Sequence, residues 1–152
     1  MNCLFRLDHY QIENVAVAQY AGFVASMTAH TGDISASINI APNKKDASKY
    51  RLTLEIQVKP TPKNERAFFP YLIAIKGHAF FTFKDPCPPA ESENTLRLNG
   101  SAILYGLLRA QIAQITALSV RGLFLLPAMN FVELAKMQQA VEPAKAAMGK
   151  KR

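Results

Sequence analysis

The sequence predicts an α+β fold in which a four-stranded antiparallel sheet is followed by two C-terminal helices. The first half of the chain alternates apolar and polar residues with a period of two, which is typical of strands with one buried face. After residue 100 the apolar spacing changes to that of an amphipathic helix. The 152 residues, 49% hydrophobic and 19% charged, fit one ordered domain.

Four segments carry the strand pattern. Residues 33–42 and 50–60 alternate most cleanly, and residues 10–26 do so less regularly. Residues 67–83 are rich in aromatics and read as one long strand, or as two strands meeting at Lys76–Gly77; the segment is shorter than the roughly 20 apolar residues of a membrane helix. The apolar positions of the two cleanest strands are Ile34, Ala36, Ile38, Ile40, Tyr50, Leu52, Leu54, Ile56 and Val58.

A proline-rich loop is expected over residues 84–100, and a helix from Ser101 to about Val120, capped near Asn99. The apolar stripe of this helix covers about 180° of its circumference, whereas a helix on one sheet needs about 100°. Either the helix is central to the core or its extra width packs against another subunit. The residues expected in such an interface are Leu104, Leu108, Gln111, Ile112 and Ile115.

A second helix is expected over residues 131–142, with Asn130 and Glu133 at capping-box spacing. Pro143 is expected to end this helix. The domain therefore spans residues 1–142, and residues 143–152 form a basic, mobile tail.

Between the two helices lies the connection "RGLFLLPAMNF", residues 121–131. An exposed apolar connection of this kind marks a binding site. The alternative is that Leu123 to Met129 cap the core, since single apolar loop residues are common.

The sequence contains no recognisable catalytic, cofactor or metal motif. We therefore favour a binding protein over an enzyme and expect no cofactor and no metal. Cys3 and Cys87 do not make a disulfide framework, and together with the lack of a signal peptide they predict a cytoplasmic protein.

The net charge is +7, but its basic residues are scattered and only Lys150 to Arg152 form a tight cluster. This pattern is typical of a solvated surface. A nucleic-acid-binding protein is a weaker alternative, because no basic and aromatic motif stands out.

Residues 104–131, "LYGLLRAQIAQITALSVRGLFLLPAMNF", resemble the SecB family of export chaperones. Arg109 and Ile112 stand at that family's Arg and following Ile, and "PAMNF" matches its Pro-Val-Asn-Phe-like end. Residues 50–69, "YRLTLEIQVKPTPKNERAFF", resemble its third strand and the turn into its fourth. The order of four strands and two helices covers nearly the whole chain.

The resemblance implies an ATP-independent holdase, a homotetramer built as a dimer of dimers through the first helix, that binds unfolded or precursor polypeptide for protein export or assembly. Its motor partner SecA recognises acidic family members, so the +7 charge argues against SecA here. A dedicated chaperone of an antitoxin or another single client is the alternative. No membrane insertion is expected.

The expected client groove has a loop wall, a helix wall and a contribution from the sheet. Replacing both Leu125 and Leu126 by Asp should leave the fold intact and abolish client binding. The residues expected to line the groove are Leu123, Phe124, Leu125, Leu126, Met129, Phe131, Leu134, Met137, Phe68, Phe69 and Tyr71.

Overall fold

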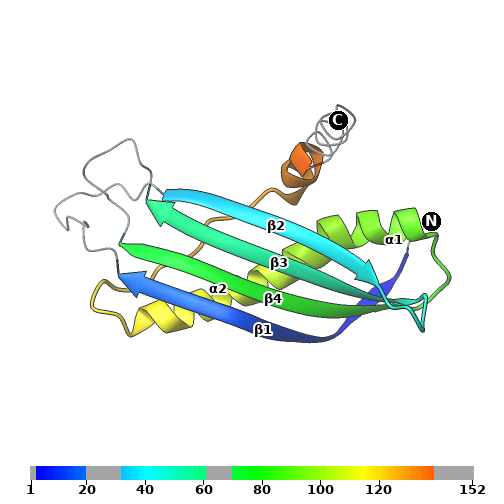
Figure 1. Cartoon of the computed structure of the whole chain (residues 1–152), viewed down its shortest axis with the longest axis horizontal. Coiled ribbons are helices and arrows are strands. Elements are labelled where there is room, and N and C mark those ends of the chain that lie inside the picture. The colour runs from blue at the N-terminus through cyan, green and yellow to red at the C-terminus, as the bar shows by residue number, and fades with distance from the viewer. Residues whose placement is uncertain (1–2, 20–31, 61–69, 139–152) are drawn as a thin grey trace, which may run out of the picture.

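A computed structural model describes residues 3–19, 32–60 and 70–138 of the protein. Within these ranges the chain forms one four-stranded antiparallel sheet with the strand order β1-β4-β3-β2, crossed on one face by helices that follow it in sequence (Figure 1). The predicted fold class, a four-stranded antiparallel sheet followed by a helical C-terminal region, is confirmed. The strands are β1 (Phe5–Gln19), β2 (Gly32–Pro42), β3 (Lys49–Pro60) and β4 (Tyr71–Phe83).

The inner face of the sheet carries the core. Every second residue of β3 from Tyr50 to Val58 is buried, as the alternation predicts. The matching residues of β2, from Ile34 to Ile40, are only partly buried, because β2 is an edge strand. The centre of the sheet is therefore the best-packed part of the molecule.

The first strand begins at Phe5, five residues before the predicted start at Tyr10. The Phe5 ring lies 5.4 Å from the Phe81 ring and 5.7 Å from the Phe83 ring, so cross-strand aromatic contacts extend the pairing beyond the alternating stretch. Residues 20–26 of the predicted strand lie outside the described residues.

The aromatic-rich segment is one strand, β4, and it does not break at Gly77. Gly77 is buried under the helix, and a Cβ placed there would lie 2.9 Å from Leu108 Cδ2. The glycine thus allows the helix to approach the sheet closely rather than turning the chain.

The helix is longer than predicted, because α1 (Pro89–Thr95), the π-turn η1 (Leu96–Gly100) and α2 (Ser101–Ala117) follow one another without a break. The expectation of a loop up to residue 100 is wrong for residues 89–100. Pro89 occupies the first turn, where a missing N–H costs nothing, and the first-turn Glu91 suits the helix dipole. Asn99 lies within the π-turn and is not a cap.

Leu104, Leu108 and Ile112 of α2 have no exposed area, because they pack on the inner face of the chain's own sheet. These three residues were expected at a subunit interface, and this packing leaves them no surface for one. Gln111 and Ile115 are partly exposed. In the described residues no helix is both long enough and apolar enough to cross a membrane.

Residues 131–138 form the described part of the second predicted helix. Asn130 Oδ1 accepts the backbone N–H groups of Val132 and Glu133 at 3.1 and 3.4 Å, so the predicted N-cap is confirmed. The predicted end of the helix, Pro143 and the tail at residues 143–152 lie outside the described residues.

Cys3 and Cys87 form a disulfide with a Cα–Cα distance of 5.8 Å. The sequence analysis did not predict this bond, because two cysteines alone make no disulfide framework. The bond joins the residues before β1 to the segment between β4 and α1, two places that the antiparallel pairing of β1 with β4 brings together although 84 positions separate them.

We predict that Gly77→Ala lowers the free energy of unfolding by about 1–3 kcal/mol, because the new methyl group meets Leu108 in a packed core. Chemical denaturation measures the change. The control is a double-mutant cycle with Leu108→Ala, which removes the obstructing atoms. The two losses should be less than additive, and strict additivity would contradict the proposed contact.

Candidate functional site

The crossover, residues 118–130, connects α2 to the helical segment 131–138 and contains neither helix nor strand. It opens with a turn in which the Gly122 N–H donates to the Ser119 carbonyl at 3.0 Å. Gly122 has a φ of 84°, which a residue with a Cβ rarely adopts. The hydroxyl of Tyr71 donates to the Gly122 carbonyl, so β4 holds this turn in place.

Polar side chains of α2 bind the backbone of the crossover along its length. Thr116 Oγ1 accepts the N–H of Phe124 at 2.9 Å, and Arg109 Nε donates to the Leu126 carbonyl at 2.6 Å. The Tyr105 hydroxyl donates to the Pro127 carbonyl at 2.5 Å, and burial raises the pKa of Tyr105, which keeps its proton on. The crossover therefore runs antiparallel to α2 as a fixed strap.

Because the crossover is extended here, its side chains alternate between core and solvent. Leu126 is fully buried and Phe124 is partly buried, whereas Leu123 and Leu125 are 62% and 51% exposed. The apolar residues of the crossover therefore have two roles. One set of residues anchors the crossover to the core, and the other set faces water.

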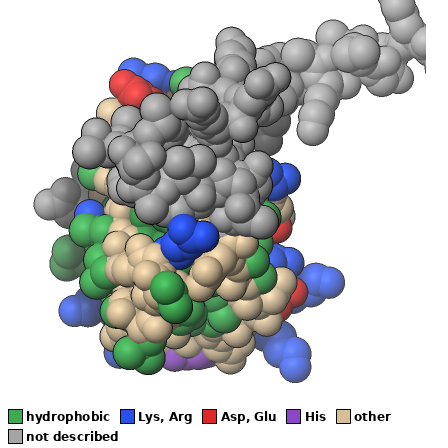
Figure 2. All heavy atoms as spheres, turned by 90° about the vertical axis from the view of Figure 1, so that its left-hand side faces the viewer, with side chains coloured by type: hydrophobic (Ala, Val, Ile, Leu, Met, Phe, Trp, Pro, Cys, Tyr) green, Lys and Arg blue, Asp and Glu red, His purple; other side chains and the backbone are tan. Residues whose placement is uncertain are grey.

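Further large apolar side chains are exposed where α2 ends. Leu118 and Val120 are each 94% exposed, and with Leu123 and Leu125 they form what we call the crossover surface. Figure 2 views this end of the molecule and shows hydrophobic side chains at its surface, below the segments drawn in grey. Isolated exposed apolar side chains are ordinary, but four on one short connection are typical of a binding surface.

An open depression of about 510 Å³ lies farther along the crossover, where it meets η1 and the start of α2. Val132, at its edge, is 48% exposed. Nearby, Arg97 Nη1 donates to Gln138 Oε1 at 3.1 Å, and the rings of Tyr105 and Phe131 lie 5.5 Å apart, so the segment 131–138 is fixed against the long helix. The apolar residues of the depression are Leu98, Ala102, Ala128, Met129, Phe131 and Val132.

Some of the residues predicted to line the groove are buried, some lie outside the described residues, and some reach solvent. Two of them, Leu126 and Tyr71, are buried in the core and leave no surface for a ligand, whereas Phe131 is 7% exposed and lines the depression. Phe68 and Phe69 lie outside the described residues. Those that reach solvent, fully or in part, are Leu123, Phe124, Leu125, Met129, Leu134 and Met137.

Sequence reasoning missed Leu118, Val120 and Val132 as exposed apolar residues. Leu118 and Val120 had been assigned to the first helix, which ends at Ala117. It also missed Tyr105, Arg109 and Thr116 as the residues that bind the crossover. Their spacing of four and seven positions, which places them on one helix face, was the available signal.

A chain of hydrogen bonds on the outer face of the sheet suggests catalysis at first sight. His78 joins Thr53 Oγ1, 2.8 Å from its Nδ1, to Glu13 Oε2, 2.5 Å from its Nε2. The hydrogen bond from His78, followed by that from Lys76, lowers the pKa of Glu13. Thr53 lies in the middle of a paired strand, where backbone N–H groups serve the sheet and none is free to stabilise an oxyanion. We therefore assign these hydrogen bonds a structural role, in which they fix side chains on the outer face of the sheet.

Comparison with solved structures shows the fold. The chain superposes on the SecB-like chaperone Rv1957 of Mycobacterium tuberculosis, solved in complex with a ChAD peptide from the antitoxin HigA1 (Rv1956). The TM-score is 0.64 at 11% sequence identity, over 83% of this chain and 91% of that one. The fold is thus SecB-like.

A protein of unknown function from Streptococcus agalactiae matches with a TM-score of 0.46 and 9% identity, over 84% of this chain and 100% of that one. No protein-family model matches the sequence, and no curated protein does.

We predict that Thr116→Val loosens the crossover at Phe124, because the Phe124 N–H loses its acceptor. The expected result is much faster hydrogen exchange at Phe124 and a loss of about 1–3 kcal/mol in unfolding free energy. Thr116→Ser keeps the hydroxyl and is the matched control. Equal exchange rates in the two variants would show that the hydroxyl does not hold the crossover.

Proposed function

We propose that the protein is an ATP-independent molecular chaperone, a member of the SecB family that holds unfolded polypeptide on the crossover surface and in the adjoining depression. The observation that carries the proposal is the division of the crossover. Its backbone is fixed by Tyr105, Arg109 and Thr116, while Leu123 and Leu125 remain exposed. A crossover that only capped the core would need no apolar residues at these two exposed positions.

Such a surface suits unfolded chains for physical reasons. Burial of apolar area contributes about 25 cal/mol per Å² and has no directional requirement, so many sequences can bind. The flexible thioether of Met129 in the depression can repack around different side chains. The fixed backbone limits the entropy lost on binding to that of the client.

The solved SecB-like chaperone bound to an antitoxin peptide supports a polypeptide client, and it favours a second candidate, a chaperone dedicated to one antitoxin. A general role in protein export is the other form of the proposal. SecA, the partner of acidic export chaperones, is disfavoured because this chain carries a net charge of +7.

We further propose that copies of the chain assemble through the outward face of α2. Arg109 is the sole charged residue from Ser101 to Val120, and it is bound to the crossover. Ile103 on the outward face is 40% exposed. Small and uncharged residues let two helices pack closely. The outward residues are Ala102, Ile103, Gly106, Ala110, Gln114 and Ala117.

Action in the cytoplasm is part of the proposal. Disulfides are rare in that compartment, because thiol-reducing systems act on them. Cys3 and Cys87 would then be present there as a pair of neighbouring thiols.

The client surface is tested by Leu123→Asp combined with Leu125→Asp. This pair replaces the earlier choice of Leu125 and Leu126, because a charge at the buried Leu126 would unfold the chain. We expect the new variant to keep its fold and to lose the ability to suppress aggregation of a denatured enzyme, measured by light scattering without ATP.

The matched control is Ser35→Asp with Ser37→Asp, which adds the same charges to exposed positions of β2. If the leucine variant suppresses aggregation as well as this control does, the crossover surface is not the client site. If the parent chain holds no denatured enzyme but binds antitoxin peptides, the client is dedicated.

The assembly is tested by Ala110→Glu, which places a charge on the outward face of α2. We expect sedimentation to show dissociation to smaller species, because a buried carboxylate without a partner opposes the helix contact. Ala90→Glu, at an exposed position of α1, is the control and should not alter the mass. An unchanged mass for both variants would exclude this face as the interface.

A further inference from the structure

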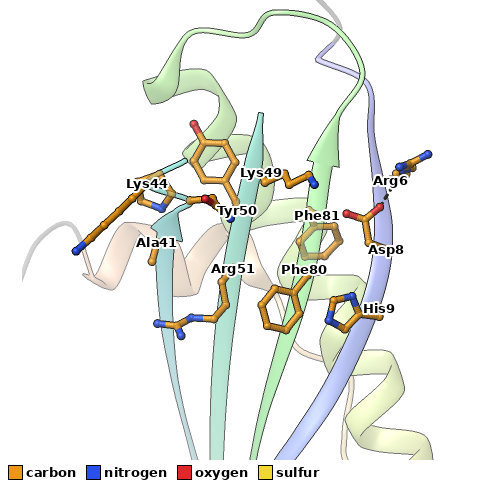
Figure 3. Close-up of a pocket in the computed structure, with 12 residues that line it drawn as sticks. Arg6, Asp8, His9, Ala41, Lys44, Lys49, Tyr50, Arg51, Phe80 and Phe81 are labelled. Carbon is orange, nitrogen blue, oxygen red and sulfur yellow. Dashed lines mark hydrogen bonds and ion pairs between the residues drawn. The ribbon is translucent and has the colours of Figure 1, made fainter. Parts of the chain in front are cut away.

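The outer face of the sheet carries a basic pocket at the end where β3 begins and β4 finishes. Strand pairing places Arg51, Phe80 and His9 in one row across the sheet, and Lys49, Thr82 and Arg6 in the next. Figure 3 shows five of these side chains, which come from three neighbouring strands: Arg6, His9, Lys49, Arg51 and Phe80. The pocket is open and has a volume of about 710 Å³, and Lys44, from the turn after β2, also lines it.

Two aromatic rings stand at the centre of this pocket. His9 and Phe80 stack with their centroids 4.4 Å apart and an angle of 11° between their planes. A register shift between Leu7 and His9 brings His9 opposite Phe80. His9 is exposed and lies on the edge strand β1, so its ring is open to a further planar group.

The charges around the rings are mostly positive. The carboxylate of Asp8 accepts hydrogen bonds from Thr82 Oγ1 at 2.5 Å and from Arg6 Nε at 2.9 Å, and the Thr82 bond is the main cause of its lowered pKa. Lys49 Nζ lies 3.8 Å from Asp46 Oδ2, within ion-pair distance. Within the described parts of the chain, Arg51 and Lys44 have no carboxylate within ion-pair distance.

We propose that this pocket binds single-stranded nucleic acid, with a base against the His9–Phe80 pair and phosphates at Arg6, Lys49 and Arg51. Stacked bases and phosphate contacts from Arg and Lys are the two interactions by which such strands bind proteins. An acidic peptide would use the cations but leave the rings without a function. The pocket lies on the sheet face opposite α2 and is separate from the crossover surface.

The test uses the full chain and a fluorescein-labelled oligothymidylate, with binding measured by fluorescence anisotropy at several salt concentrations. His9→Asn should weaken binding roughly 5- to 150-fold, the range expected for one lost stacking contact. Phe80→Leu should also weaken binding, because the His9 ring loses its stacking partner. Arg51→Gln should weaken binding and reduce the salt slope by about 0.7, as for one lost phosphate contact on a single strand.

Matched variants separate this site from others. Lys76→Gln changes a cation on the same sheet face that is paired with Glu13, and it should leave affinity within about twofold, because it touches no phosphate. The Leu123→Asp, Leu125→Asp variant should bind the oligonucleotide like the parent. If Phe80→Leu fails to fold, His9→Asn on the exposed edge tests the same stack.

Three results would overturn the proposal. The first is no binding at low salt. The second is binding that neither Arg51→Gln nor the ring variants weaken, which would place the nucleic acid elsewhere on this basic chain. The third is displacement by polyglutamate as effective as by unlabelled oligonucleotide, with no effect of the ring variants, which would identify a surface for an acidic protein.

Discussion

The close contact between the long helix and the inner face of the sheet is the constraint on which the rest of the structure depends. Gly77 and Gly100 both lie at this contact, and a Cβ at either would meet Leu108, Leu96 or Leu52 within 3.3 Å. Because the helix lies so near, its apolar stripe fills the core with Leu104, Leu108 and Ile112 fully buried. The sheet thus has one face that packs against the helix and one face that is open to solvent.

The position of α2 then decides the form of the crossover. With one side of the helix committed to the sheet, an adjoining line of Tyr105, Arg109 and Thr116 is available to bind a passing backbone. The crossover takes an extended form along that line, so neighbouring side chains must point in opposite directions. Exposure of Leu123 and Leu125 is therefore a consequence of backbone hydrogen bonding on a fixed support, and it requires no flexible loop.

The two faces of the molecule differ in chemistry. The helix side presents apolar groups at the crossover, and the outer sheet face presents cations around a pair of rings. Polypeptide and nucleic acid are the ligands proposed for these faces, and they meet different physical forces. Apolar burial depends weakly on salt, whereas phosphate contacts weaken steeply as salt rises. The proposed polypeptide site and the proposed nucleic-acid site can therefore be tested independently.

The sequence by itself determined the sheet, α2 and the helical segment 131–138, because a period of two or of 3.6 is a local property that burial on one face imposes. It also indicated the crossover as the exceptional segment and Asn130 as a helix cap. It did not predict the helical turns of residues 89–100. Only the tertiary structure decided which leucines of the crossover face water, since that depends on hydrogen bonds from side chains of α2 up to 22 positions away. The Cys3–Cys87 pair and the basic pocket were equally out of reach, because strand pairing unites residues that are far apart in the chain.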